Sequence, residues 1–458
     1  MVLLHEYFLF TLHLKLYFIL NLFDLTLKLN GFAIDKAKLV LKEIQSKNDT
    51  DFNTYVELKK REVFDFHLKH NSFYKSFVKN TKNSNWNRIP VMTKKDLQQP
   101  LKSLLSEGYA VDNIYIDKTS GASGTPFIFS KSKFSHALTW AIIQNRFGWF
   151  HIDFNHSKQA RFYGIPFDKK GYYREKLKDF LSNRVRFNVF DLSDNAFENW
   201  ITIFKKKQLE YINGYTSSIV QFAKFLQQKN LNLKTICPSL KVCIVTSEML
   251  FYEDKKLMET QFGVPIVNEY GASELDLIAF ENPEREWQVN SETLFVEILD
   301  DKNNVLPYGE EGRLVITSLY NKSQPFIRYD IGDIGILSKK STLKKPILEK
   351  LTGRTNDIVI LPSGKKAAGL TFYYITKSII EDDGHVKEFV IEQLKVDTFK
   401  INYVSTNELS EEKRIRIINE MENYLEKGLT ILFEKQEKLI RSKSGKLKQF
   451  SSYLKQNP

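Results

Sequence analysis

One stretch of this chain, residues 119–126, combines hydroxyl side chains and glycines in a way that suits the binding of an anion. It reads Thr-Ser-Gly-Ala-Ser-Gly-Thr-Pro. Glycine lets the backbone turn several N–H groups toward one point, and the Ser and Thr oxygens add side-chain donors. No Gly-Lys-Ser/Thr follows, so the stretch is not a Walker A phosphate loop. A polar surface loop is the alternative explanation for this stretch alone.

Four further stretches place charged or aromatic residues beside glycine. They are Asn-Glu-Tyr-Gly-Ala-Ser-Glu at 268–274, Arg-Tyr-Asp-Ile-Gly-Asp at 328–333, Gly-Arg-Thr-Asn-Asp at 353–357 and Arg-Ser-Lys-Ser-Gly-Lys at 441–446. Each alone is weak, because a turn, a helix cap or a solvated basic tail would explain it. All five in this order and spacing are much harder to obtain by accident, so we interpret them together.

The elements around the first stretch are those of an α/β protein. A strand pattern at 114–116 precedes it, and apolar residues at helical spacing predict a helix after it, with Ser132 as the N-cap. The stretch is therefore expected between a strand and a helix, where α/β proteins often bind anions. Further strands are predicted at 159–166, 185–190, 240–246 and 265–268, and helices at 217–228 and 253–262. This alternation indicates an α/β fold with a parallel or mixed sheet.

The rest of the chain suggests three parts. Residues 1–85 are predicted to form a helical extension. Residues 86–352 form the large domain, in which a period of two from 292 onward marks a β-rich subdomain at about 290–350. Residues 353–458 form a small α+β domain, with strands at 389–394 and 399–404.

The first 33 residues are rich in Leu, Phe and Tyr, but they do not predict a membrane-spanning helix. Glu6, Lys15, Asp24 and Lys28 interrupt them, whereas a spanning helix needs about 20 nearly uncharged residues. We expect an amphipathic helix with at most peripheral membrane contact.

Composition excludes several functional classes. The net charge of +12 comes from 67 Lys and Arg against 55 Asp and Glu. The excess is spread along the chain without the basic, aromatic-interleaved patch of single-strand binders, so no nucleic-acid partner is expected. Cys237 and Cys243 are too few for a disulfide scaffold and lack metal-ligand spacing, which favours a reducing, cytoplasmic compartment. His136 and His151 are interpreted as structural.

Together the five stretches resemble the adenylate-forming superfamily of acyl-CoA synthetases, peptide-synthetase adenylation domains and luciferases. The resemblance spans about residues 89–450. Three segments resemble its phenylacetate-CoA ligase-like branch: Ile-Pro-Val-Met-Thr-Lys-Lys-Asp-Leu at 89–97, Val-Thr-Ser-Glu-Met-Leu at 245–250 and Pro-Phe-Ile-Arg-Tyr-Asp at 325–330. Within the branch the chain looks most like ligase-like proteins of capsule and surface-polysaccharide biosynthesis. The resemblance implies a large multi-layer α/β domain with a small mobile C-terminal domain.

The resemblance also implies a reaction and a set of site residues. A carboxylate would attack the α-phosphate of ATP, giving an acyl-adenylate and pyrophosphate. The β- and γ-phosphates would be held by Thr119, Ser120, Gly121, Ser123, Gly124 and Thr125. Adenosine would be bound by Tyr270, Gly271, Ser273, Asp333 and Arg354. Glu274 would bind Mg²⁺, and Lys446 would bridge the carboxylate and the α-phosphate. Thr119, Glu274 and Lys446 are the predicted catalytic residues.

The sequence defines the acid substrate and the acyl acceptor less closely than it defines the ATP-binding residues. The acid pocket is expected among Trp140, Phe147, Tyr163, Gly214, Tyr215 and residues near 248, with no charged residue that indicates a particular substrate, and an aromatic-lined pocket suits an aromatic or acyl carboxylate. The same aromatic residues are also typical of plain core. The resemblance implies transfer to CoA or to a phosphopantetheine carrier.

Several alternatives stay open at this point. The acceptor could be an amine or a hydroxyl, such as a sugar amine, in place of a thiol. The chain could also be a non-catalytic scaffold in polysaccharide assembly. An acyl carrier protein and a homodimer are further partners left open.

Overall fold

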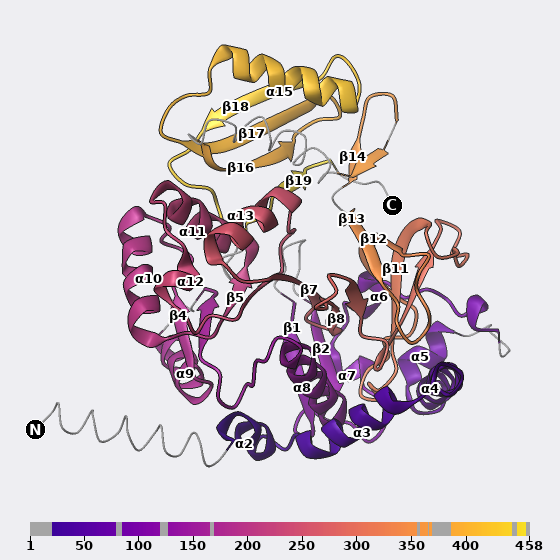
Figure 1. The fold of residues 1–458 in the computed structure, drawn as a ribbon. Coiled ribbons are helices and arrows are strands. Elements are labelled where there is room, and N and C mark those ends of the chain that lie inside the picture. Colours follow the sequence, from indigo (N-terminus) through magenta and orange to yellow (C-terminus); the bar gives the residue numbers. More distant parts are fainter. Residues whose placement is uncertain are drawn as a thin grey trace, which may run out of the picture.

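The structure is a computed structural model that describes residues 21–78, 85–119, 127–164, 169–354, 358–364, 366–368, 386–441 and 447–454. A large α/β unit carries a smaller unit, which lies at the top of Figure 1 and contains the C-terminal sheet and its helix. The predicted α/β fold class is confirmed by this arrangement. The division at residue 353 stays a prediction.

A seven-stranded sheet forms the centre of the large unit. Its strand order is β4-β3-β5-β6-β7-β8-β9; the first five strands are parallel and the last two are antiparallel. The bounds are β3 Gln159–Phe162, β4 Arg184–Phe187, β5 Tyr211–Tyr215, β6 Val242–Thr246, β7 Ile266–Ala272, β8 Asp276–Glu281 and β9 Trp287–Val289. β5 and β6 are buried along their whole length, as expected for a parallel sheet that is covered on both faces.

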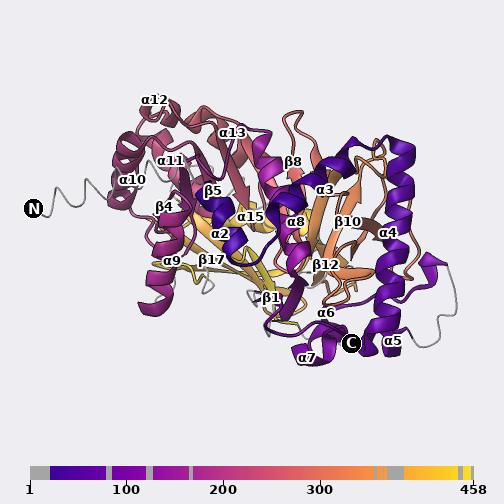
Figure 2. The same cartoon turned by 90° about the horizontal axis from the view of Figure 1, so that it is seen from below.

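Helices cover both faces of this sheet. One layer contains α10 (Asp194–Lys207), α11 (Thr216–Gln228), α12 (Leu233–Ile236) and α13 (Tyr252–Phe262), which bury Trp200, Phe222 and Met258 against the strands. The other layer contains α3 (Ile34–Ser46) and α8 (Lys133–Gly148), which run side by side (Figure 2). Ser132 caps α8 as predicted, because its Oγ accepts a hydrogen bond from the Ser135 N–H at 3.2 Å. The two predicted helices at 217–228 and 253–262 are confirmed to within one residue at each end.

Short elements and N-terminal helices complete the large unit. Their bounds are α2 Leu22–Leu29, α4 Asp49–His70, α5 Ser72–Phe77, the 3₁₀ turn η1 Trp86–Arg88, α6 Lys94–Leu97, α7 Leu101–Leu104, β1 Ile114–Lys118, β2 Ile128–Ser132 and α9 Lys169–Leu181. None of the helices that the structure describes is long and apolar enough to cross a membrane. Residues 1–20 lie outside the described residues.

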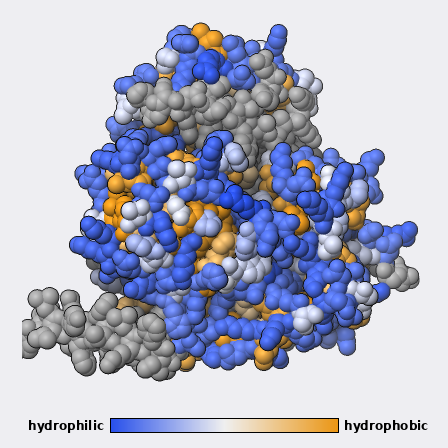
Figure 3. Space-filling view, viewed as in Figure 1, coloured by the Kyte–Doolittle hydropathy of each residue, from blue (hydrophilic) through white to orange (hydrophobic). Residues whose placement is uncertain are grey.

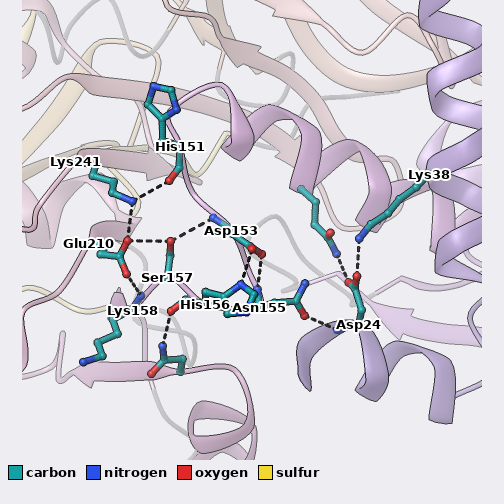
Figure 4. Close-up of polar contacts among 12 residues, drawn as sticks. Asp24, Lys38, His151, Asp153, Asn155, His156, Ser157, Lys158, Glu210 and Lys241 are labelled. Carbon is teal, nitrogen blue, oxygen red and sulfur yellow. Dashed lines mark hydrogen bonds and ion pairs between the residues drawn. The ribbon is translucent and has the colours of Figure 1, made fainter. Parts of the chain in front are cut away.

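A polar network fastens α2 to the large unit (Figure 4). The Asp24 N–H donates to Asn155 Oδ1 at 3.1 Å, and the Asp24 carboxylate accepts from Lys38 at 2.5 Å and from Gln144 at 2.8 Å. One charged residue of the N-terminal stretch is therefore buried and paired. Part of this stretch belongs to the folded unit.

Two further sheets follow the central one. The antiparallel sheet β10-β11-β12-β13 has the bounds Leu294–Leu299, Glu311–Ser318, Tyr329–Leu337 and Leu348–Arg354. The C-terminal sheet β18-β17-β16-β19 has the bounds Thr430–Lys435, Thr398–Ser405, Val386–Gln393 and Phe450–Ser452. Helix α15 (Glu411–Tyr424) packs on it, and the hairpin of β14 (Ile358–Ile360) and β15 (Lys366–Ala368) lies between the two sheets along the chain. The C-terminal unit has a core of its own, which includes Phe389, Ile401 and Met421.

The face of the molecule seen in Figure 3 is mostly hydrophilic, and its apolar residues gather in separate patches rather than in one continuous band. The largest of these patches lie over the helices at the left of the large unit. This distribution agrees with the spread of charge along the sequence.

Candidate active site

The hydroxyl- and glycine-rich stretch joins two strands of a hairpin. β1 and β2 pair antiparallel, and α8 begins only after β2 ends. The stretch is expected between a strand and a helix; the strand and the helix are present, but a second strand at residues 128–132 separates the stretch from the helix. Thr119 closes the base of the hairpin: its N–H donates to the Phe127 carbonyl at 2.9 Å, and its Oγ1 accepts from the Phe127 N–H at 3.1 Å. The predicted phosphate-binding residues Ser120, Gly121, Ser123, Gly124 and Thr125 lie outside the described residues.

Two predicted adenosine-binding residues meet although they are far apart in the sequence. The Tyr270 hydroxyl of β7 donates to Asp333 Oδ2 of β12 at 2.5 Å. Arg354 of β13 is the backbone neighbour of Asp333 in the antiparallel sheet. The central sheet and the β-rich sheet thus bring an aromatic ring and a carboxylate to one place, which is the chemistry needed to hold a purine and a ribose.

The stretch around Gly271 is a strand rather than the predicted turn, since β7 continues to Ala272. A Cβ at Gly271 would lie 2.5 Å from the Asp276 carbonyl of β8. Close approach of these two strands is therefore a reason for glycine at this position that needs no ligand. The proposed approach of a purine at Gly271 stays a prediction.

Glu274 lies in the turn between β7 and β8. It is only 8% exposed, and its Oε1 accepts a hydrogen bond from the Tyr329 hydroxyl at 3.0 Å. Burial raises the pKa of Tyr329, and the neighbouring Glu274 carboxylate raises it further, so the tyrosine is a proton donor at neutral pH. Tyr329 fixes one oxygen of Glu274, and the described residues donate no hydrogen bond to the other one.

A single carboxylate oxygen fits Mg²⁺, which is usually bound through one or two carboxylates, several waters and substrate phosphates. No group of three or more His, Cys, Asp or Glu side chains that could hold a metal by themselves occurs in the part of the chain that the structure describes. A metal at Glu274 would therefore need oxygens from the nucleotide.

Lys131 is a site residue that the sequence interpretation missed. This buried lysine of β2 pairs with Asp276 at 2.5 Å and donates to the Ser273 carbonyl at 2.8 Å. Thr139 of α8 donates to the same Asp276 at 2.6 Å. The two contacts of Lys131 tie the hairpin of the first stretch to the turn that presents Glu274. A lone lysine on a strand has no motif that would have revealed this role.

The segment after Lys446 contacts the large unit. Lys446 itself lies outside the described residues, but the next N–H, that of Leu447, donates to Glu248 Oε1 at 2.9 Å. The other oxygen of Glu248 accepts from the Ser217 N–H at 2.7 Å, at the start of α11. The C-terminal segment that carries the predicted catalytic lysine therefore lies beside the carboxyl end of β6.

The expected acid pocket is partly core. Phe147 is buried in the hydrophobic cluster beneath α8, and a Cβ at Gly214 would clash with the Phe162 backbone at 2.3 Å. Tyr163 and Tyr215 do lie together at the strand ends, with ring centroids 4.7 Å apart. Tyr163, Gly214 and Tyr215 therefore lie at the carboxyl ends of the parallel strands, and Trp140 and Phe147 lie on α8.

The expectation that no charged residue lines this region is wrong. Arg161 of β3 stacks on the Tyr163 ring at 4.1 Å, and Glu269 of β7 lies beside Thr246 of β6. Burial raises the pKa of Glu269 to about 7, although Thr246 and Arg161 lower it. Glu269 stood within the stretch 268–274, but the prediction from that stretch used only its tyrosine, glycine, serine and final glutamate.

His136, Cys237 and Cys243 are buried, in agreement with their structural interpretation. His136 stacks on Tyr115 with ring centroids 3.8 Å apart, and its Nε2 accepts from Trp140 at 3.1 Å. Burial lowers the pKa of His136 to about 4, so it is neutral. His151 contributes its backbone carbonyl, which accepts from Lys241 at 3.0 Å (Figure 4). Both cysteines are buried thiols.

Known proteins resemble the chain in sequence and in fold. Protein CapK of Staphylococcus aureus is 23% identical over 373 residues, which cover 78% of this chain and 79% of CapK. A phenylacetate-coenzyme A ligase of Aromatoleum evansii is 26% identical over 170 residues, 34% of this chain and 38% of that ligase. No family model matches the chain. Among solved structures, 2-hydroxyisobutyryl-CoA ligase in its postadenylation state has a TM-score of 0.68 at 15% identity, covering 90% of this chain and 91% of that one.

The chain is similar in sequence to CapK and to phenylacetate-CoA ligases, and it shares its fold with adenylate-forming ligases. The predicted resemblance to the phenylacetate-CoA ligase-like branch and the predicted multi-layer fold are therefore confirmed. These similarities support the enzyme class that the sequence predicted, an adenylate-forming ligase. The similarity to 2-hydroxyisobutyryl-CoA ligase depends on the state of that enzyme, because the TM-score falls to 0.54 for its thioesterification state.

Proposed function

We propose that this ligase activates a carboxylic acid with ATP and passes the acyl group to the thiol of CoA or of a phosphopantetheine carrier. The observation that carries the proposal is the contact of Tyr270 with Asp333, with Glu274 four residues further along the chain. These side chains come from two different sheets and provide a purine-stacking ring, a ribose acceptor and a metal ligand.

The reaction has two balanced steps. A carboxylate oxygen of the acid forms a bond to the α-phosphorus of ATP, and the bond from that phosphorus to the bridging oxygen breaks, which releases pyrophosphate. The thiol sulfur then bonds to the acyl carbon, AMP leaves with the former carboxylate oxygen, and the thiol proton passes to solvent. Charge accumulates on the phosphates in the first step, so oriented donors and cations are the main requirement.

The residues divide this work. Asp333 accepts the ribose hydroxyls, and Tyr270 stacks on the adenine. The 119–126 loop donates to the β- and γ-phosphates, and Lys446 neutralises the carboxylate and the α-phosphate as they approach each other. Glu274 would hold Mg²⁺, which neutralises charge on the phosphate oxygens when it is bound. Arg354 would reach the ribose or a phosphate.

A role in the biosynthesis of a surface or capsular polysaccharide is the finer part of the proposal. The similarity to CapK over most of both chains supports it. An amine or hydroxyl acceptor is the alternative to a thiol. The amide bond synthetase McbA of Marinactinospora thermotolerans shares this fold with a TM-score of 0.51 at 14% identity, so the fold itself does not decide between the acceptors.

Exchange of labelled pyrophosphate into ATP, dependent on a carboxylic acid, tests the first step. We expect exchange with at least one acid of a broad library, and its loss in Asp333→Ala and Lys446→Ala. If no acid supports exchange, or if Lys446→Ala exchanges like the wild type, the proposed activity is wrong. Product analysis with CoA and with an amino sugar then identifies the acceptor.

A further inference from the structure

Two side chains of opposite charge lie on one face of the parallel sheet without an ion-pair partner among the residues that the structure describes. They are Arg161 of β3 and Glu269 of β7. Arg161 lies opposite Asn213 of β5, and Glu269 lies opposite Thr246 of β6. Three strand spacings separate β3 from β7, about 14 Å, so Asn213 and Thr246 lie in the gap between the two charges.

The other polar side chains of this face lie in the same gap or form hydrogen bonds at its edge. The Tyr163 hydroxyl donates to Asn213 Oδ1 at 3.2 Å. Thr246, the neighbour of Glu269 on β6, lowers the pKa of the Glu269 carboxyl. The Nε atom of Arg161 is buried and has no hydrogen-bond partner. Arg161 lowers the pKa of Glu269 across this gap without forming an ion pair with it, so a ligand group that donates to the half-buried carboxylate would offset part of the cost of burying it.

We place the acyl part of the acid on this face, next to the strand ends that lead to the adenosine contact and to the segment after Lys446. Successive residues of a strand point to opposite sides, so Glu269 points away from the side on which the next residue, Tyr270, meets Asp333. Thr246 of β6 is the neighbour of Glu269 in the sheet. Glu248 follows two residues after Thr246, and its side chain accepts a hydrogen bond from the Leu447 N–H. Glu269 therefore directly precedes the adenosine-binding Tyr270 in β7 and lies on the strand next to β6, whose end leads to Glu248 and the segment after Lys446.

We propose that the acid activated here is a polar one, whose acyl part carries an amine or hydroxyl that donates to the Glu269 carboxylate. This inference rests on the adenylating activity proposed above. It replaces the unsubstituted aromatic or acyl acid suggested by the tyrosines, because a plain aryl or alkyl group would leave this half-buried carboxylate without a donor. The burial that raises the pKa of Glu269 agrees with a carboxylate that lacks a permanent cationic partner.

Pyrophosphate exchange with matched acids tests this specificity. One series is propanoate, lactate and alanine; the other is phenylacetate, mandelate and phenylglycine. We expect the wild type to use a substituted acid at least about tenfold better, in kcat/KM, than its unsubstituted counterpart, since a hydrogen bond to a charged group discriminates by about that factor.

Two variants of Glu269 separate the two donor chemistries. Glu269→Leu should abolish the preference for either substituent. Glu269→Gln should keep the preference if the substituent is a hydroxyl and lose it if the substituent is an ammonium group, because glutamine keeps an acceptor oxygen but not the charge. Glu198→Gln, an exposed residue of α10, is the matched control and should behave as the wild type.

The possible failures are distinguishable. If the unsubstituted acids are preferred, or if Glu269→Leu leaves the preference unchanged, the specificity proposal is overturned while adenylation stands. If no acid supports exchange while calorimetry shows that the protein binds Mg-ATP, the activity itself is wrong and the specificity proposal with it. Mg-ATP binding by Glu269→Leu also shows that this variant is folded.

Discussion

At the scale of single residues, the ion pair of Lys131 and Asp276 supports the candidate site, although no sequence motif indicated it. The Lys131 side chain is 3% exposed and that of Asp276 22%. The same ammonium group holds the Ser273 carbonyl, so it fixes the backbone next to Glu274. We assign Lys131 the role of a positioning residue, because it acts on the site through Ser273 and Asp276.

Lys131→Met should therefore reduce both stability and nucleotide binding. Removing one partner of a buried pair leaves the other charge uncompensated, which costs about 3 kcal/mol or more. The affinity for Mg-ATP should fall as well, because the turn that carries Glu274 loses its anchor. Thermal unfolding and calorimetry with Mg-ATP measure the two effects.

A second substitution separates these two effects. Adding Asp276→Asn to Lys131→Met should restore much of the stability, because no unpaired charge remains, but it should not restore Mg-ATP affinity. Lys133→Met, two residues further along, is the control and should change neither. If the double variant binds Mg-ATP like the wild type, Lys131 has no positioning role.

The sequence predicted residues that belong to motifs better than residues that only face one another in space. Tyr270 and Asp333 were predicted to act together and do so. Lys131, Arg161 and Glu269 were not predicted as a set, because each becomes informative only when strand register puts it beside another. The register of a parallel sheet depends on long-range pairing that a single sequence does not display.

At the scale of elements, helix α9 is built with its polar side inward. Arg186 of β4 donates to Asp179 at 2.7 and 2.8 Å and to Glu175 at 2.9 Å. Apolar residues of the same helix face solvent, with Tyr173 70% and Leu177 58% exposed. This inversion explains why no helix was predicted at 169–181: the usual apolar stripe toward the core is missing.

Arg186→Ala should detach α9 from the sheet. Asp179 and Glu175 would then repel each other beneath the helix without a cation between them, with an expected loss of about 3 kcal/mol. Trypsin cleavage within 169–181 should become faster than in the wild type, and the thermal transition should move to lower temperature. Leu177→Ser is the matched control and should change stability by less than about 0.5 kcal/mol, because this side chain is exposed. Slow cleavage in Arg186→Ala would show that other contacts hold the helix.

At the scale of the whole molecule, the two units share an interface next to the candidate site. Phe251, which precedes α13 of the large unit, is buried in the hydrophobic core of the C-terminal unit. Gln221 of α11 donates to the Lys387 carbonyl at 2.5 Å, and Arg441 donates to Ser217 of α11 and to Glu388 of β16. The arrangement of units is closer to the postadenylation state of 2-hydroxyisobutyryl-CoA ligase than to its thioesterification state, with TM-scores of 0.68 and 0.54.

Fold class and element order could be predicted from the sequence, but this interface could not. The hydrophobic periodicity of each segment indicates helices and strands locally. Nothing local indicates that Phe251 packs into another unit, since a buried phenylalanine has the same sequence pattern in either core. Movement of the C-terminal unit during the reaction stays a prediction, and the contacts of Glu248 offer a way to test it.

Glu248 should matter for adenylation and not for acyl transfer. It accepts the Leu447 N–H with one oxygen and the Ser217 N–H with the other, and hydrogen bonds to a charged group contribute about 1.5–3 kcal/mol each. Glu248→Ala should therefore lower acid-dependent pyrophosphate exchange about tenfold or more, because Lys446 loses its neighbouring anchor. Transfer from a preformed acyl-adenylate to the acceptor should stay within about twofold of the wild type if the C-terminal unit moves away for that step. Glu253→Ala, on the exposed start of α13, controls for a general effect of removing a carboxylate nearby. Equal losses in both half-reactions would mean that Glu248 supports α11 and the fold rather than one arrangement of the two units.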